Sequence, residues 1–371
     1  MHKEEKKNIN LISQNLLLGN GNLGEGVSIQ LAKDGRRILW LAHESAPKNF
    51  TGVDVSDPRN PKVIVQTDLP HNKVRSNSLD VVGDMMAVAY QTQTWGDEPA
   101  GIEIFDISKP ENPRSIGYYD CSSPWSRGAH QVWFVEDGWL TAAAPTKDFK
   151  PKESWDDQPF LMLDISNPSK PVESCFWWYP GTRDSDDEPA PPRHPRFSQG
   201  WRCHNTNVYP ERPDRAYIGY IDGGAMILDI SDKSAPKLVS HWNPHPPANG
   251  FTHTVLPLFD RDLIIASDEC VYDLGEDWPK RVWVLDAQVE NNLVPISTLP
   301  MPPVEEYAPR GGRFGAHNVH ENRPGPSFRS EEIIIGTYFN AGVRVHDISN
   351  PFEPKEIAYY VPEAPNGSPT G

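Results

Sequence analysis

Four short phrases in the sequence place a histidine immediately before an alternating run of apolar residues. They are "SRGAHQVWF", "GWRCHNTNVY", "NGFTHTVLP" and "RFGAHNVHEN", and their histidines are His130, His204, His253 and His317. Equivalent positions of alternating strands point the same way. Neutral imidazoles that converge on one point suit a divalent transition metal. The phrases therefore predict a metal site, provided that the fold brings the four strands together.

The ion itself follows less directly from the residue types. Four neutral ligands leave an ion its full charge and one or two open positions, which suits either dioxygen chemistry or Lewis-acid chemistry on a carbonyl or hydroxyl. We expect Fe(II), with zinc, manganese and copper as alternatives. The alternative without a metal is a cluster in which the histidines bond one another through ordered water.

The histidine phrases belong to a longer repeat. Alternating apolar residues followed by Asp-Ile-Ser-x-Pro, or a close variant, occur at Asp54, Asp106, Asp164, Asp229 and Asp347, with a degenerate copy at Asp286. Asp and Ser side chains in such a phrase bond nearby backbone amides in a turn, and the prolines stop the strand. We therefore interpret these aspartates as turn residues and not as catalytic carboxylates.

Each repeat contains four short runs with strand character. One such sheet cannot bury both faces alone, whereas six arranged radially can. The sequence thus predicts an all-β fold, a six-bladed β-propeller with four antiparallel strands per blade. Residues 1–24 would form an N-terminal extension and residues 25–371 a single propeller domain. The phrase "NLLLG" is a candidate closing strand.

The innermost strand of a propeller blade runs beside the central axis. Each of the four histidines begins such a strand, so the four should meet on the axis, on the face that also carries the longest loops. Long irregular loops gathered on one rim usually build a site. In the same register, Glu25 and Asn77 occupy the equivalent positions of the first two blades.

Arginines and aromatic residues accompany the histidines. Guanidinium binds carboxylate bidentately and stacks on rings, so this pattern predicts an anionic or aromatic small-molecule substrate. Salt bridging with the acidic loops is the alternative role for each arginine. The candidate substrate-binding residues are Arg127, Arg202, Arg313, Trp125, Trp201, Phe251, Phe314, Glu25 and Asn77.

General acids or bases are expected where second strands end on the same face. The candidates for this catalytic role are Glu44, Asp268, Glu269 and Tyr338. A carboxylate close to an imidazole N–H would also orient that ligand.

The repeat phrase resembles that of the LVIVD-repeat proteins, and the resemblance covers nearly the whole chain. It implies the propeller fold but says little about activity. By analogy, the four-histidine set is similar to that of carotenoid-cleavage oxygenases, seven-bladed propellers that hold ferrous iron on the axis. Oligogalacturonate lyases, which use three histidines and a glutamine, are a more distant parallel.

Composition excludes several partners. The chain of 371 residues has a formal charge of −16, which argues against nucleic acid or an anionic membrane as a partner. Its first residues, "MHKEEKKNINLISQ", are charged and lack an apolar segment, so we expect a cytoplasmic protein. Nucleotide-binding and serine-hydrolase motifs are missing from the sequence. The oligomeric state does not follow from these patterns.

Three functions are compatible with these patterns. The first is a mononuclear metalloenzyme, an oxidoreductase of the non-haem iron dioxygenase type that acts on an anionic or aromatic molecule. The second uses the same four histidines for redox-neutral work as a lyase, hydratase or hydrolase. The third is a non-catalytic propeller whose rim docks a protein, as many repeat arrays do.

Overall fold

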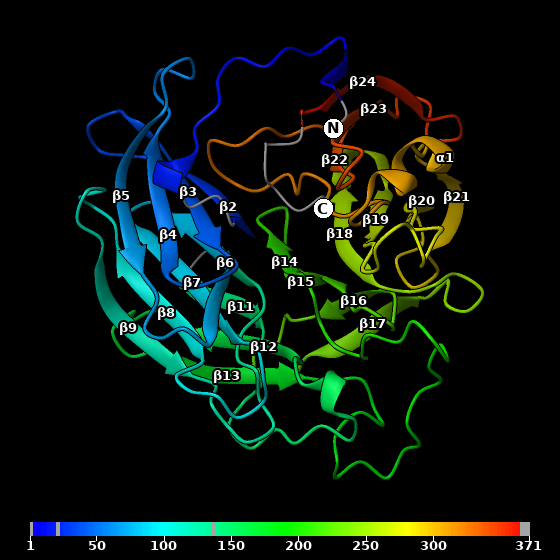
Figure 1. Ribbon diagram of the computed structural model, residues 1–371. Coiled ribbons are helices and arrows are strands. Elements are labelled where there is room, and N and C mark those ends of the chain that lie inside the picture. Colours follow the sequence, from blue (N-terminus) through cyan, green and yellow to red (C-terminus); the bar gives the residue numbers. More distant parts are fainter. Residues whose placement is uncertain (1–2, 20–22, 136–137, 364–371) are drawn as a thin grey trace.

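The computed structural model describes residues 3–19, 23–135 and 138–363. Its strands form six four-stranded antiparallel sheets that stand around a common axis as the blades of a propeller (Figure 1). This confirms the predicted all-β, six-bladed fold. Within the described residues, α1 (Val304–Tyr307) is the only α-helix, and no helix is long and apolar enough to span a bilayer.

Five sheets share one order, in which each strand pairs with the next along the chain. The first contains β2 (Leu23–Leu31), β3 (Arg37–His43), β4 (Lys48–Asp54) and β5 (Lys62–Asp68). The second contains β6 (Val74–Val82), β7 (Met85–Thr92), β8 (Gly101–Asp106) and β9 (Arg114–Asp120). The third contains β10 (Val132–Val135), β11 (Trp139–Ala143), β12 (Phe160–Asp164) and β13 (Val172–Trp177). The fourth contains β14 (Thr206–Tyr209), β15 (Arg212–Gly219), β16 (Ala225–Asp229) and β17 (Lys237–Trp242). The fifth contains β18 (Thr252–Leu258), β19 (Leu263–Asp268), β20 (Val282–Asp286) and β21 (Val294–Thr298).

The sixth sheet is built from both ends of the chain. Strands β22 (Ile333–Thr337), β23 (Val343–Asp347) and β24 (Lys355–Val361) are joined by β1 (Glu5–Lys7), which pairs antiparallel with β24. The ring is therefore closed by β1, while the "NLLLG" phrase contains a 3-10 turn at Leu17–Gly19.

The innermost segment of the sixth blade is irregular. Where a strand was expected, residues 317–320 form the single bridge Val319–Gly336. The backbone N–H groups of His317 and His320 donate to the carbonyls of Thr337 and Ile335 in β22. His317 is thus held beside the axis without a regular inner strand.

The six phrase aspartates have the turn role that the sequence predicted. Each accepts a hydrogen bond from the backbone N–H two residues later, at 2.8 to 3.0 Å. The bond closes the turn after the third strand of each blade, so these carboxylates are structural.

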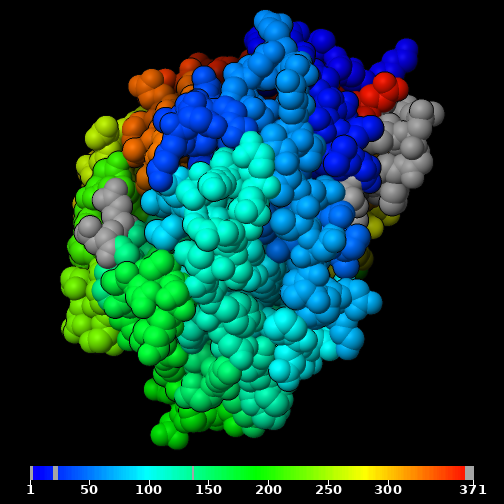
Figure 2. All heavy atoms as spheres, turned by 90° about the vertical axis from the view of Figure 1, so that its left-hand side faces the viewer, coloured from blue at the N-terminus to red at the C-terminus, as the bar shows by residue number. Residues whose placement is uncertain are grey.

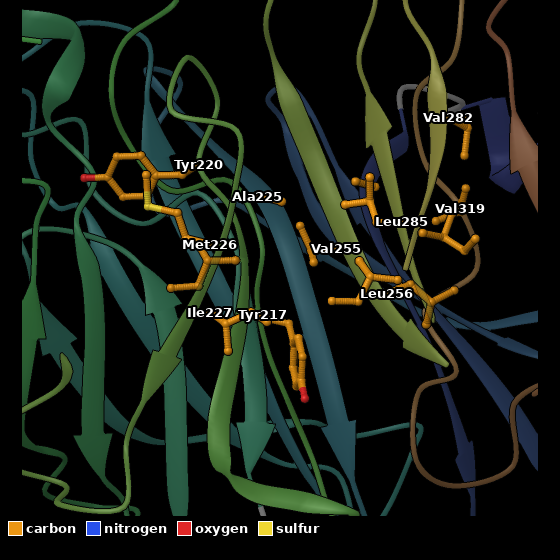
Figure 3. Close-up of a cluster of buried hydrophobic side chains, with 14 of the residues drawn as sticks. Tyr217, Tyr220, Ala225, Met226, Ile227, Val255, Leu256, Val282, Leu285 and Val319 are labelled. Atoms are coloured by element: carbon orange, nitrogen blue, oxygen red, sulfur yellow. The ribbon is translucent and has the colours of Figure 1, made fainter. Parts of the chain in front are cut away.

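Apolar side chains fill the space between neighbouring blades. In Figure 3, Met226 and Ile227 of β16 and Tyr217 of β15 lie across from Val255 and Leu256 of β18, and all five are buried. Figure 2 shows the side of the disc, where the blue and cyan segments of the first two blades lie next to one another. This packing fixes the ends of the inner strands around the axis.

Candidate metal centre

Bulges direct three side chains toward the axis. The pairing register shifts around Glu25 in β2, Asn77 in β6 and His253 in β18. Bulges re-aim side chains and are frequent beside functional sites. The bulge at Glu25 needs a glycine next to it, because a Cβ atom on Gly26 would collide with the backbone of Leu79 in the next blade.

The four predicted histidines lie together. Their ring centroids are 4.2 Å apart for His130 and His204, 3.6 Å for His204 and His253, and 4.7 Å for His253 and His317. The rings of four consecutive blades thus form an arc on the axis, and the Nε2 atoms of His130 and His204 are 2.8 Å apart.

Glu25 adds a carboxylate from the first blade. Its Oε2 lies 3.6 Å from Nε2 of both His204 and His253 and 3.9 Å from that of His130, and its Oε1 lies 3.8 Å from Nε2 of His317. Ligand nitrogens that are each about 2.1 Å from one ion lie roughly 3 to 3.5 Å apart. The spacing fits one ion after small movements. We call the four histidines and Glu25 the axial cluster.

Glu269, a predicted catalytic residue, borders the axial cluster. Its Oε2 is 3.8 Å from Nε2 of His204, and its Oε1 is 3.8 Å from Nε2 of His317. Arg313 donates to the same Oε1 at 2.8 Å. Donor atoms of Glu25, His204, His253 and Glu269 all lie within 4.8 Å of one another.

Three of the histidines bind a side-chain oxygen through Nδ1. The pairs are His130 with Gln91 at 3.1 Å, His204 with Asn205 at 2.8 Å and His253 with Thr254 at 2.7 Å. Metal-ligating histidines typically donate their second N–H in this way, which fixes both the tautomer and the ring orientation.

The partners of these oxygens determine the direction of each bond. The Thr254 hydroxyl donates to Oδ1 of Asn318 at 3.1 Å, so it accepts from Nδ1 of its own histidine. Asn205 donates through Nδ2 to Glu321, and Oε1 of Gln91 also accepts from Arg75. The protons of His204 and His253 are therefore on Nδ1, and their Nε2 lone pairs face the axis. Nδ1 of His130 also lies 3.3 Å from the Asn77 amide nitrogen, a donor, and its Nε2 lies 2.8 Å from that of His204.

Two Nε2 atoms lack a protein partner. Those of His253 and His317 are buried and have no hydrogen bond within the described part of the chain. Buried polar atoms without a partner are uncommon in folded proteins. A cation on the axis would satisfy both lone pairs, so the donor set fits a divalent metal.

Burial and mutual repulsion favour the neutral form of three of the four imidazoles, those of His130, His204 and His253. Burial, and next His204, lower the pKa of His130 well below its ordinary value, and burial together with His253 lowers the pKa of His204 to about 3. Burial opposes the charge of Glu25, yet the surrounding histidines hold its pKa well below the usual range. For His317, burial is outweighed by the nearby carboxylates, which raise its pKa. Neutral imidazole and ionised carboxylate are the forms that bind metals.

The other predicted acid–base residues have different surroundings. Burial raises the pKa of Glu44, whose Oε1 is 3.3 Å from Arg75. Asp268 accepts a hydrogen bond from the Trp283 indole at 2.8 Å. Tyr338 is fully buried in the hydrophobic core. The structure thus places Glu269 at the axial cluster, Asp268 in hydrogen bonds with Trp283 and Thr252, and Tyr338 in the hydrophobic core.

The three predicted arginines are bound in three ways. Arg127 forms a two-bond ion pair with Asp157, at 2.7 and 2.8 Å, and Arg313 pairs with Glu269 as described. Arg202 is 5% exposed and donates to Oε1 of Gln158 at 2.7 Å. Burial, and next Arg127, lower the pKa of Arg202 to about 10, so it stays charged at neutral pH.

The predicted aromatic residues are divided between site and core. The ring of Phe251 lies edge-on to His204, with centroids 5.7 Å apart. Trp201 and Phe314 are buried in the core. Trp125 is 44% exposed and has Lys150 over its ring.

Asn77 contacts the axial cluster as a donor. Its Nδ2 donates to the backbone carbonyl of His130 at 3.0 Å, and its Nδ2 is 3.3 Å from Nδ1 of the same histidine. Asn77 therefore supports a predicted ligand, and no direct role in binding a substrate follows from these contacts.

Sequence reasoning missed several supporting residues. A polar residue follows the histidine in all four phrases, and two of these residues, Asn205 and Thr254, are the Nδ1 partners. That regularity is a signal that could have identified them. Gln91 comes from another blade, and Phe339 stacks on His317 with centroids 4.7 Å apart, so neither had a local signal.

Two cavities lie along the axis beyond the histidines. A polar one of about 40 Å³ is lined by residues that include Glu25, His253, Asn205, Glu321 and Arg323. An apolar one of about 280 Å³ lies at the opposite ends of the inner strands, where Leu31, Val82 and Val135 line it together with Arg323. Arg323 separates the two and is neutralised by Asp80 and Glu321.

Comparison with known families supports the repeat assignment. Residues 156–176 and 214–243 match the LVIVD repeat. These segments contain the phrases at Asp164 and Asp229, so the predicted resemblance to that repeat is confirmed. No curated protein matches the chain.

Several solved structures share the fold. A protein from Lactobacillus plantarum has a TM-score of 0.60 at 11% identity, covering 91% of this chain and 85% of its own. The β-propeller domain of Myceliophteria thermophila Cps50 (Swd1) has a TM-score of 0.53 at 12% identity, with 92% and 88% covered. A chain of the COPII coat assembled on membranes has a TM-score of 0.55 at 12% identity, and the match covers 88% of this chain but 41% of that one. Similarity at these identities shows a common fold and nothing further.

Proposed function

We propose that the protein is a metal-dependent enzyme that binds one divalent transition-metal ion on the propeller axis and acts on a small anionic molecule. One observation carries the proposal: four Nε2 atoms and the Glu25 carboxylate converge, while three of the Nδ1 atoms are bound elsewhere. The proposal rests on this geometry, since the similar solved structures share only the fold.

The ligands would be His130, His204, His253 and His317 with Glu25. An ion bound there supplies Lewis acidity or a place for dioxygen. The chain supplies the surroundings: Phe251 packs against the ring of His204, and Phe339 packs against that of His317. Glu269, held by Arg313, is placed to accept or donate a proton at a substrate atom beside the ion.

Charge around the axial cluster favours an anionic substrate. Five carboxylates and four arginines interact here, namely Glu25, Glu44, Asp157, Asp222 and Glu269 with Arg75, Arg127, Arg202 and Arg313, so the site carries about one net negative charge. A divalent ion would add two positive charges. The site would then attract an anion although the whole chain carries −16.

Two reaction classes are compatible with this donor set. Imidazole and carboxylate are both ligands of Fe(II) in non-haem oxygenases, and we keep oxidation by dioxygen as the first choice. The carboxylate of Glu25 also makes the site suitable for redox-neutral lyase, hydratase or hydrolase work. Turnover under anaerobic conditions separates the two classes. An oxygenase stops without dioxygen, whereas a Lewis-acid enzyme continues at an unchanged rate.

Elemental analysis of untagged protein tests the metal itself. We expect about one equivalent of metal per chain. The His204→Ala and His253→Ala variants should lose this metal but keep the fold. His71→Ala is the matched control, because His71 bonds the carbonyl of Pro99 on an exposed turn. Much less than one equivalent in the unchanged protein, even after reconstitution, would refute the metal site.

A non-catalytic docking propeller is the second candidate. It is compatible with the propeller fold, which is shared with a chain of the COPII coat, and the long loops gathered on one face favour it. Full biological activity of His204→Ala and His253→Ala after loss of the metal would establish docking over catalysis.

A further inference from the structure

Arginines gather where the loop-bearing face meets the axial cluster, and most of them have an acidic partner. The ion pairs are Arg75 with Glu44 at 3.3 Å, Arg127 with Asp157 at 2.7 Å, and Arg313 with Glu269 at 2.8 Å. Arg202 differs, since no carboxylate of the described residues lies within the 4.0 Å of an ion pair. A buried arginine normally has such a partner.

Neutral oxygens hold Arg202 in place. Its Nη1 donates to Oε1 of Gln158 at 2.7 Å, and its Nε donates to the carbonyl of Gln199 at 3.1 Å. Its Nη2 makes no hydrogen bond to a described residue. Because a guanidinium has five N–H donors, several remain available although the side chain is 95% buried.

Arg202 is fixed above two ligands of the axial cluster. It precedes His204 by two residues in the chain. Gln158, which holds it, donates through Nε2 to the carbonyl of Gly128 at 3.3 Å, two residues before His130. The guanidinium is thereby tied to the starts of the third and fourth inner strands, on the face that carries the long loops.

An aromatic surface lies beside this guanidinium. The ring centroid of Trp155 is 6.0 Å from Cζ of Arg202 and 4.6 Å from Cζ of Arg127, and Trp155 is 44% exposed. Arg127 covers part of this ring and Trp95 meets it edge-on at 5.2 Å, so a planar group would pack against the part that stays exposed while its charge meets Arg202.

We propose that Arg202 binds the carboxylate of the substrate and that the substrate class is a small aromatic or planar monocarboxylate. The carboxylate takes the free N–H groups of Arg202, the planar part packs against Trp155, and the reacting atom faces the axial cluster. The position of the reacting centre in this inference rests on the proposed function. Among the arginines near the histidines, Arg202 would be the one that determines specificity for a carboxylate.

Calorimetric titration of the unmodified protein with two probes tests the charge requirement. Benzoate and benzamide have nearly the same shape, but only benzoate can form charge-assisted bonds to a guanidinium. We expect benzoate to bind at least about tenfold more tightly. Equal affinity, or no binding of benzoate up to about 10 mM, would overturn the inference.

Variants test the residue. Arg202→Met should weaken benzoate binding at least about tenfold while benzamide binding stays unchanged, and Arg202→Lys, which keeps the charge without the planar fork, should fall between. Arg183→Met is the control, because Arg183 lies on another loop, where it pairs with Asp148. Unchanged benzoate affinity in Arg202→Met overturns the inference. If Arg202→Met fails to fold, the affinity of Arg202→Lys for benzoate and the ratio of benzoate to benzamide affinity in the unmodified protein test the inference instead.

Metal content is measured on the same samples, so that the metal site and the role of Arg202 are tested independently of each other. Charge-selective benzoate binding that depends on Arg202, in a protein without bound metal, would refute the proposed metalloenzyme and leave the assignment of Arg202 standing. One equivalent of metal without charge selectivity would overturn the assignment of Arg202 alone.

Discussion

The hydroxyl of Thr254 accepts the Nδ1 proton of His253 at 2.7 Å. Its own proton goes to Asn318, so the bond has one direction and the Nε2 lone pair of the histidine must face the axis. The residue after a candidate ligand thus determines which nitrogen can bind a metal.

Replacement of this hydroxyl should weaken metal binding without unfolding the chain. Thr254→Val keeps the side-chain shape but removes the acceptor, and loss of such a partner typically costs about 10- to 100-fold in metal affinity. Competition with a chelator measures the change. Thr67→Val is the matched control, since Oγ1 of Thr67 has no hydrogen-bond partner among the described residues. Equal affinities for the two variants would contradict a positioning role.

The two carboxylates at the site should not contribute equally. Glu25 faces all four histidines, whereas Oε1 of Glu269 is already bonded to Arg313. We therefore expect Glu25→Gln to lower metal affinity by more than tenfold and Glu269→Gln by only a few-fold. The same chelator assay measures both, and a larger loss for Glu269→Gln would reverse the assignment of ligand and neighbour.

A buried histidine far from the axis should make the fold sensitive to acid. Burial lowers the pKa of His346 to about 4. Since the unfolded chain has an ordinary histidine pKa near 6.5, the unfolded state takes up the proton first. The contribution of His346 to the free energy of unfolding is complete above about pH 6.5. It is lost as the pH falls toward 4, and the loss amounts to about 3 kcal/mol.

His346→Gln provides the comparison, because glutamine can still donate to the carbonyl of Pro300 that now accepts from the ring. Urea unfolding at several pH values measures the difference between the two proteins. That difference should shrink, or change sign, as the pH falls from 7 to 4. A constant difference would contradict the shifted pKa.

Ring closure should depend on one side chain of β1. Glu5 accepts hydrogen bonds from the hydroxyl of Tyr307 and from Arg310, both at 2.7 Å. Glu5→Gln should lower the free energy of unfolding by about 1 to 2 kcal/mol, as expected for charge-assisted bonds. Glu4→Gln is the control, because the bonds of Glu4 to Lys6 and Tyr360 lie at the surface, and we expect little change. No loss of stability in Glu5→Gln would show that β1 is held by its backbone pairing and not by this side chain.

Local patterns were sufficient for the fold. The Asp-Ile-Ser phrase predicts its turn from bonds within two residues, and the number of phrases gives the number of blades. The histidine phrases predicted which side chains would meet, because a two-residue period needs no tertiary knowledge.

Other features depend on contacts between blades that a single phrase does not contain. At the bulge around Glu25, Gly26 lies against the backbone of the second blade, and the phrase itself contains no sign of this contact. The ion pair between Glu269 and Arg313 joins two blades. The irregular inner segment at His317 likewise follows from its neighbours and not from its own alternation.

The pairing of β1 with β24 sets an order of assembly. Residues 5–7 must find residues 359–361, and the donors of the axial cluster extend from Glu25 to His317. Closing so long a loop is slow and comes late in folding. During synthesis an ion would thus find no complete set of donors until the sixth blade exists. A bound ion stabilises only the state that binds it, so it would stabilise only chains whose six blades are complete. It would thereby add to the stability of a ring whose two ends are joined by three residue pairs of β1 and β24.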